Sequence, residues 1–201
     1  MTNPIIETVS AWLETDGIDP DSYFTIMRKW VSQAYHADVG NNPIHALERG
    51  EATHAEFEQV LASQLVLLDG GPVPGEGLLA RMFAGTVLDP DMLQLFRRLH
   101  AAGVPTGLLS NSWGVGDYPR DLFPDMFDAV VISGEVGMRK PEPRIFRHAA
   151  ELLGLDPREC IFIDDIEANI TAAEQAGFSG VLHRDADVTG QRVGELLGVE
   201  L

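Results

Sequence analysis

The sequence predicts an α/β protein in which a parallel sheet is covered by helices and preceded by a helical region. From residue 88 onward, short apolar runs alternate with helix-forming segments, and this alternation is typical of parallel strands joined by right-handed crossovers. Before that point, residues 5 to 67 carry apolar side chains at spacings of three and four, the pattern of amphipathic helices. A stretch rich in Gly and Pro at 70–75 separates the two regions.

In the N-terminal region, individual signals define where helices begin and end. Gly17 is a stop signal, Asn42 before Pro43 is a start signal, and Thr53 with Glu56 forms a capping box. The expected helices cover residues 5–16, 43–47, 53–67 and 76–84, and a further one begins at residue 24 and is stopped near Gly40.

The second region is expected to alternate strictly between strands and helices. Asp89 before Pro90 is a helix start, and Pro141 is placed to open another helix. The expected strands cover 106–109, 129–132, 160–163 and 180–183. The expected helices cover 89–103, 141–153, 167–176 and 188–197.

Composition and charge exclude several classes of protein. A chain of 201 residues suits one domain, or one domain with a sizeable insertion. Its formal net charge of −17 repels nucleic acid and anionic membranes, so neither is an expected partner. No apolar run has the length of a membrane span, and no signal peptide precedes the first helix. We therefore expect a cytoplasmic protein, and its single cysteine, Cys160, forms no intramolecular disulfide.

Two adjacent acids, Asp164 and Asp165, follow the apolar run 160–163. They are expected at the C-terminal edge of a parallel sheet, where α/β proteins bind ligands. Two neighbouring carboxylates repel each other, so a cation or a basic group is needed to hold both ionised. Oxygen ligands of this kind suit Mg²⁺. The alternative is that the acids only end the strand and cap the next helix.

Two other segments carry polar groups at or beyond strand ends. Ser110 and Asn111 follow the strand at 106–109, and their hydroxyl, amide and backbone N–H groups suit an anionic oxygen. Lys140, one of only two lysines, precedes the proline that opens a helix, and its ammonium suits a phosphoryl oxygen or a carboxylate. The alternatives are a polar turn for the first segment and a solvated loop lysine for the second.

Taken together, these three segments in this order resemble the haloacid dehalogenase-like (HAD) hydrolase superfamily. Ser110 matches its motif II, Lys140 its motif III, and Asp164 with Asp165 its motif IV. The segment from Gly137 to Phe146 looks like the branch with a helical cap, which includes the phosphatase domain of soluble epoxide hydrolases. The resemblance covers nearly the whole chain. It implies a helical cap region at 1–86 and a HAD-type α/β core at 87–201 with a Rossmann-like parallel sheet.

The resemblance implies Mg²⁺-dependent hydrolysis of a phosphate ester through an aspartyl-phosphate. Asp165 would be the metal ligand, while Asp164 would hold Lys140 or support the metal shell. Ser110 and the backbone of Asn111 would bind the transferring phosphoryl group, and Lys140 would offset its charge. The substrate would be a small phosphorylated metabolite. The acid pair argues against dehalogenation, because dehalogenases of this superfamily work without a metal.

One part of the family's pattern is not matched. The nucleophilic aspartate of motif I ends a first, central strand before the cap, but this sequence begins at Met1-Thr2-Asn3-Pro4, which we expect to lie already in the loop after that motif. The central strand is therefore expected to be absent from this chain, and we expect an in-frame upstream segment to carry it. The alternative is a non-catalytic phosphate-binding, metal-binding or regulatory protein. A generic nucleotide-binding module is disfavoured, because no Gly-x-Gly-x-x-Gly stands between a strand and a helix.

Overall fold

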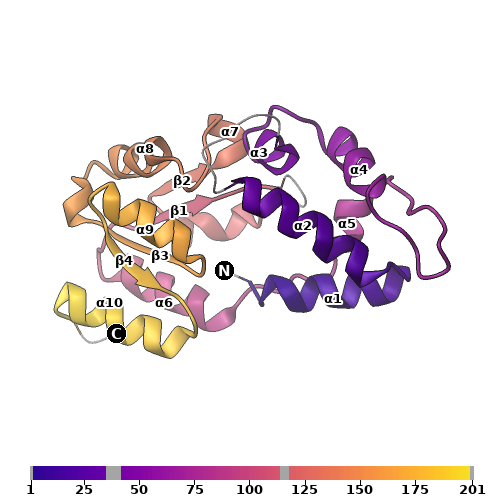
Figure 1. Ribbon diagram of the computed structural model, residues 1–201. Helices are drawn as coiled ribbons and strands as arrows, with labels where there is room; N and C mark the ends of the chain where they lie inside the picture. The colour runs from indigo at the N-terminus through magenta and orange to yellow at the C-terminus, as the bar shows by residue number, and fades with distance from the viewer. Residues whose placement is uncertain (1, 35–41, 114–117, 200–201) are drawn as a thin grey trace. The chain divides into compact units, whose positions relative to one another are not determined.

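The protein is described from a computed structural model, which covers residues 2–34, 42–113 and 118–199 (Figure 1). Contacts divide the chain into two compact units. The helical unit comprises Thr2–Leu88 and Ser112–Gly116, and the sheet unit mainly Asp89–Asn111 and Asp117–Leu201. The end of the helix expected from residue 24 to near Gly40, from Tyr35 onward, lies outside the described residues. Each unit is described by itself.

The helical unit contains the helices expected from the apolar spacing. They are α1 (Ile5–Asp16), α2 (Pro20–Ala34), α3 (Pro43–Glu48), α4 (His54–Ala62) and α5 (Leu78–Met82). Gly17 ends α1 in the left-handed conformation, at φ 64°, and the capping box of Thr53 and Glu56 is present at the start of α4. None of the helices in the described part of the chain is both long and apolar enough to cross a membrane.

Aromatic side chains form much of the core of the helical unit. The Phe57 ring packs against the rings of Trp30 and Trp113, with centroids 5.8 and 5.7 Å away. Trp113 also packs edge-on against Phe83 at 6.0 Å, and its indole N–H donates to Oε1 of Glu48 over 3.2 Å. Glu48 is buried. Trp113, which follows the first strand of the sheet unit, therefore belongs to the core of the helical unit.

The expected helix 53–67 was wrong in its length, because α4 ends at Ala62. Val66 and Leu67 instead form isolated antiparallel bridges with Pro72 and Ile18. Backbone bridges thus replace the last turns of the expected helix. Contacts with residues distant in sequence override the local apolar pattern here.

The sheet unit contains four parallel-paired strands, as the alternation of strands and helices predicts. They are β1 (Gly107–Ser110), β2 (Ala129–Ile132), β3 (Ile161–Asp164) and β4 (Ser179–Leu182). β1 pairs with β2, with Ser110 opposite Ile132. β3 pairs with β4, with Asp164 opposite Leu182. Each pair is a separate two-stranded sheet, and Ser110 and Asp164 end their strands on the carboxyl side.

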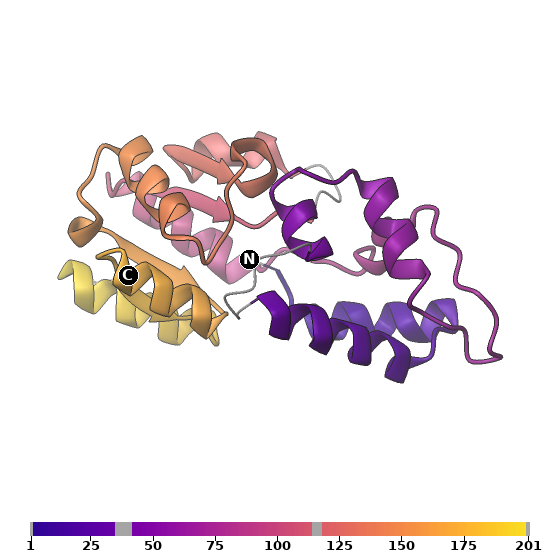
Figure 2. The same ribbon diagram turned by 45° about the horizontal axis from the view of Figure 1, so that its top comes forward.

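Helices cover both faces of these strands (Figure 1, Figure 2). They are α6 (Pro90–Ala101), α7 (Ser133–Val136), α8 (Pro143–Leu153), α9 (Glu167–Gln175) and α10 (Ala186–Leu197), with 3₁₀ turns η1 (Arg120–Asp125) and η2 (Pro157–Glu159). Phe162 joins the apolar cluster of α8 and α9, whereas Ile161 and Ile163 pack with the cluster of α6 and α10. Successive residues of β3 therefore face opposite layers, as alternation along a strand requires.

The helix expected from Pro141 begins two residues later, at Pro143. Glu142 is its N-cap, at φ −62° and ψ 128°, so it is extended. A residue before proline is pushed out of the helical region by the proline ring, and Glu142 precedes Pro143. The second of the two prolines therefore determines where α8 starts.

One edge of β1 and one edge of β3 lack a strand partner. Among residues 2–34, 42–113 and 118–199, β1 pairs only with β2 and β3 only with β4. Leu108, Leu109 and Ser110 are only partly buried, whereas strands inside a parallel sheet are normally buried on both faces. Among the described strands, β1 and β3 thus each have one edge without a strand partner, and so do β2 and β4 on their far sides.

Candidate active site

The ammonium of Lys140 forms an ion pair with Asp164 at the carboxyl end of β3. Nζ lies 2.6 Å from Oδ2 of Asp164, and the two side chains are only 11% and 5% exposed. Nζ also lies 5.6 Å from the centroid of the Phe162 ring, within range of a cation–π attraction. Lys140 is therefore a largely buried, paired cation, and the solvated loop lysine is wrong.

The other oxygen of Asp164 is occupied as well. Oδ1 accepts hydrogen bonds from the backbone N–H of Ile166, at 2.9 Å, and from Nδ2 of Asn169, at 3.1 Å. Asn169 is itself buried, on α9. The N-cap of α9 is Ile166, and no side chain caps it. Asp164 is thus held at a fixed position by Lys140 and Asn169, and it does not serve as a helix cap.

Asn111 connects the segment after β1 to the lysine segment. Its Nδ2 donates to the carbonyl of Lys140 over 3.0 Å, and its Oδ1 accepts from the backbone N–H of Lys140 over 2.8 Å. The side chain of Asn111 is therefore engaged with backbone and fixes the position of Lys140. Its backbone N–H group is the part of Asn111 that suits an anion.

Ser110 ends β1 and points its hydroxyl toward a phenol. Oγ of Ser110 lies 2.9 Å from Oη of Tyr118 and 3.5 Å from the carbonyl of Asn111. The sequence reasoning missed Tyr118, because a tyrosine eight residues after the strand carries no motif signal. The structure thus brings Ser110, Asn111, Lys140 and Asp164 into one chain of contacts, and adds Tyr118 and Asn169 to it.

Asp165 differs from Asp164 in its surroundings. Its side chain is exposed, and within the described part of the chain its carboxylate makes no hydrogen bond or ion pair. Only its carbonyl is contacted, by Arg184 at 3.3 Å. The described residues contain no group of three or more His, Cys, Asp or Glu side chains that could hold a metal. One free carboxylate still fits Mg²⁺, which is usually bound through one or two carboxylates together with phosphate oxygens and waters.

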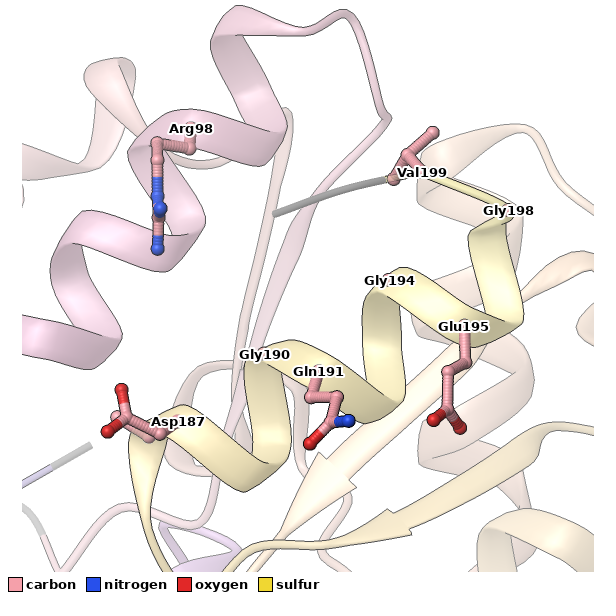
Figure 3. Close-up of a pocket in the computed structure, with 9 residues that line it drawn as sticks. Arg98, Asp187, Gly190, Gln191, Gly194, Glu195, Gly198 and Val199 are labelled. Atoms are coloured by element: carbon pink, nitrogen blue, oxygen red, sulfur yellow. The ribbon is translucent and has the colours of Figure 1, made fainter.

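A surface hollow elsewhere on the sheet unit does not include this site (Figure 3). Its lining comes from α6 and from the C-terminal helix, and consists of Arg98, Ala186, Asp187, Gly190, Gln191, Gly194, Glu195, Gly198 and Val199. A Cβ at Gly190 would lie 3.7 Å from a methyl group of Leu95, which is an ordinary van der Waals contact. None of the sequence-predicted site residues lines the hollow.

Comparison with known sequences is consistent with this arrangement. A family model described as haloacid dehalogenase-like hydrolase matches residues 2–177. Bifunctional epoxide hydrolase 2 of Rattus norvegicus is 26% identical over 172 residues, which are 79% of this chain and 31% of that protein. The sesquiterpene phosphatase astK of Aspergillus oryzae is 29% identical over 157 residues, 75% of this chain and 77% of that protein. The chain thus spans about a third of the length of the rat protein.

A solved structure of similar fold holds ligands of the expected kind. It is a HAD family enzyme from Bacteroides thetaiotaomicron, in complex with magnesium and inorganic phosphate. It shares 26% identity and a TM-score of 0.58, and the match covers 84% of this chain and 88% of that chain. A predicted HAD-like hydrolase from Porphyromonas gingivalis matches at a TM-score of 0.61 and 20% identity, over 90% of this chain and 91% of that chain.

Proposed function

The chain belongs to the haloacid dehalogenase-like hydrolase family, and we propose that it serves Mg²⁺-dependent hydrolysis of the phosphate ester of a small metabolite in the cytoplasm. The observation that carries this proposal is the connected set of Ser110, Asn111, Lys140 and Asp164 at the carboxyl ends of β1 and β3. A phosphatase among the relatives and a magnesium–phosphate complex among the similar structures support the same reaction class.

In this proposal the residues of the chain act as a phosphoryl-binding edge. The Ser110 hydroxyl and the backbone N–H of Asn111 donate to phosphoryl oxygens. Lys140 supplies the positive charge that offsets the charge developing on the phosphoryl group. Asp164 and Asn111 act through Lys140, since one pairs with its ammonium and the other holds its backbone. The site therefore offers donors in fixed positions, which need no rearrangement as the reaction proceeds.

Asp165 is the residue that would hold Mg²⁺, because its carboxylate is exposed and uncommitted while both oxygens of Asp164 are engaged. A bound Mg²⁺ would shield the negative charges of phosphate and nucleophile from each other. One protein carboxylate makes a weak site, so further oxygen ligands from the substrate and from a second acid are part of the proposal.

The nucleophile is proposed to be an aspartate on a strand that pairs between β1 and β3. The support is structural: each of these strands has one open edge among the described residues, and a strand inserted between them would pair with both. Its carboxyl end would lie beside Ser110 and Asp164, where an aspartate could attack phosphorus and form an aspartyl-phosphate that water then hydrolyses. None of the described strands carries such a residue beside these two.

The helical unit is proposed to act as the cap that determines which ester is accepted. The support is that this unit is compact and has an apolar core cluster of its own. Caps in such hydrolases exclude water during the reaction, which protects the covalent intermediate.

The experiment that tests the proposed function compares the 201-residue chain with the chain extended by its in-frame upstream codons. The extended protein should melt at a higher temperature, because paired strand edges satisfy buried backbone groups at about 1–3 kcal/mol each. It should hydrolyse p-nitrophenyl phosphate with Mg²⁺ and lose this activity with a chelator. A well-folded extended protein with an Asp-bearing strand and no hydrolysis of any phosphate ester would favour the non-catalytic binding protein.

A further inference from the structure

Tyr118 lies against the hydroxyl to which the proposed function assigns phosphoryl binding. Its Oη is 2.9 Å from Oγ of Ser110. Among the described residues, Ser110 is the only hydrogen-bond partner of this phenol. Both residues belong to the sheet unit, and one lies at the end of β1 while the other precedes η1. The contact is therefore made by two segments that meet at the carboxyl edge of β1.

Tyr118 is held in place through its ring and through its backbone. Its ring packs against Phe123 at 6.3 Å between centroids. Phe123 is 8% exposed and is supported in turn by Phe127, at 5.8 Å. The carbonyl of Tyr118 accepts the backbone N–H of Arg120 over 2.6 Å. A fixed ring gives the phenol a fixed approach to Ser110.

The number of hydroxyl hydrogens on Ser110 determines whether its oxygen donates to Tyr118 or accepts from it. A serine hydroxyl has one hydrogen to donate and can accept two. A serine that binds a phosphoryl oxygen must direct that single hydrogen at the anion. Any other contact of the Ser110 hydroxyl must then be one in which its oxygen accepts, and Tyr118 has a hydrogen to donate. The alternative acceptor for the Ser110 hydrogen, the carbonyl of Asn111, is 3.5 Å away, which is too long for a strong bond.

We propose that Tyr118 is a positioning residue: its O–H donates to Ser110 Oγ and leaves the serine hydrogen directed at a phosphoryl oxygen. This inference rests on the proposed role of Ser110 in phosphate binding. Donation to Oγ also polarises the serine O–H, since linked hydrogen bonds strengthen one another. Tyr118 itself does not touch the phosphoryl group.

The test is a double-mutant cycle on the affinity for inorganic phosphate in the presence of Mg²⁺, measured by calorimetry on the whole chain. The variants are Tyr118→Phe, Ser110→Ala and the two combined. Phenylalanine keeps the ring that packs on Phe123, and thermal unfolding checks that the fold is retained. The matched control is Tyr23→Phe, which removes the hydroxyl of a buried tyrosine in the helical unit.

Tyr118→Phe should weaken phosphate binding about three- to tenfold, the loss expected for one hydrogen bond. In the Ser110→Ala background the same substitution should have no further effect, and Tyr23→Phe should bind like the parent. An equal loss in both backgrounds would overturn the inference, because Tyr118 would then contact the anion directly. If Tyr118→Phe binds phosphate normally while Ser110→Ala binds it weakly, the inference about Tyr118 is overturned and the proposed role of Ser110 stands. Binding that is unaffected by Ser110→Ala, or absent from the parent, would overturn the proposed role of Ser110 and this inference with it.

Discussion

The side-chain amide of Asn111 holds the backbone of Lys140 at both polar groups: it donates to the carbonyl at 3.0 Å and accepts from the N–H at 2.8 Å. An amide that donates and accepts in this way replaces the pairing a neighbouring strand would provide. Lys140 lies in a segment between α7 and α8, outside any strand. The position of its ammonium therefore depends on a residue 29 positions earlier in the chain.

Asn111→Ala should destabilise the chain and weaken phosphate binding together. It leaves two partly buried backbone groups of Lys140 without partners, at a cost of about 1–3 kcal/mol. Chemical denaturation and phosphate calorimetry measure the two effects. Asn111→Asp keeps the acceptor and loses the donor, so it should fall between the parent and the alanine variant. If Asn111→Ala is as stable as the parent, the amide does not hold Lys140.

Lys140→Met should destabilise the fold by about 3–5 kcal/mol, because it leaves the buried Asp164 carboxylate without its cation. Adding Asp164→Asn removes that charge, so the double variant should recover part of the lost stability. The free energies of unfolding of the two single variants and the double variant measure this coupling. Additive losses would indicate that the two groups do not interact.

Lys140→Ala should weaken phosphate binding by about 1.5–3 kcal/mol, as expected for one hydrogen bond to a charged group. Lys29→Ala is the matched control, because it removes the only other lysine, an exposed one on α2. Calorimetric titration with phosphate compares the two variants. Should both bind like the parent, the role of Lys140 would be confined to its ion pair.

Asp165→Ala should abolish Mg²⁺ binding and leave stability nearly unchanged. The residue is exposed, and surface substitutions usually change stability by no more than about 0.5 kcal/mol. Glu167→Ala removes another exposed acid two residues away and should leave Mg²⁺ binding intact. Mg²⁺ titration of the three proteins measures both effects. Equal affinities would remove Asp165 from the metal site.

Asp128 should make the stability of the sheet unit depend on acid pH. Its carboxylate accepts the backbone N–H of Thr106 over 2.8 Å, and this bond holds the pKa of Asp128 below its ordinary value. Because the pKa of Asp128 is lower in the folded chain than in the unfolded chain, its carboxylate stabilises the fold at pH values above the unfolded pKa, near 4. This stabilisation is lost as the pH falls through the folded pKa.

Asp128→Asn should therefore be less stable than the parent at pH 7, and the difference should shrink below about pH 4. Thermal unfolding of both proteins at pH 7, 5 and 3 measures it. Asp121→Asn, on the exposed side of η1, removes an acid without touching Thr106 and is the control. A difference that is the same at all three pH values would contradict the role of the charge.

The strands were predictable because short apolar runs between turn residues are typical of buried strands in a parallel sheet. The strand 129–132 matches β2 residue for residue, and the other three are displaced by one position. The start of α8 was also encoded locally, since Pro143 prevents Glu142 from being helical. What failed was the choice between two prolines, each of which can occupy the first helical position.

Long-range partners were not predictable from local pattern. The end of α4 depends on the bridges of Val66 and Leu67 to distant residues, and no spacing within the helix encodes them. Ser110, Lys140 and Asp164 stood out because each follows or precedes a regular element. Tyr118 did not, because its contact with Ser110 is visible only in the folded chain.

The place of Trp113 limits how this protein can be recombined. The residue comes two positions after Asn111, yet its indole packs on Phe57 and Phe83 and donates to Glu48. If only Thr2–Leu88 were exchanged for the helices of a relative, the indole of Trp113 would lose its contacts with Phe57, Phe83 and Glu48. A new helical unit must therefore be transplanted as two pieces of sequence, and the second piece directly follows Ser110 and Asn111. This junction between the two units therefore lies within the few residues from Ser110 to Trp113.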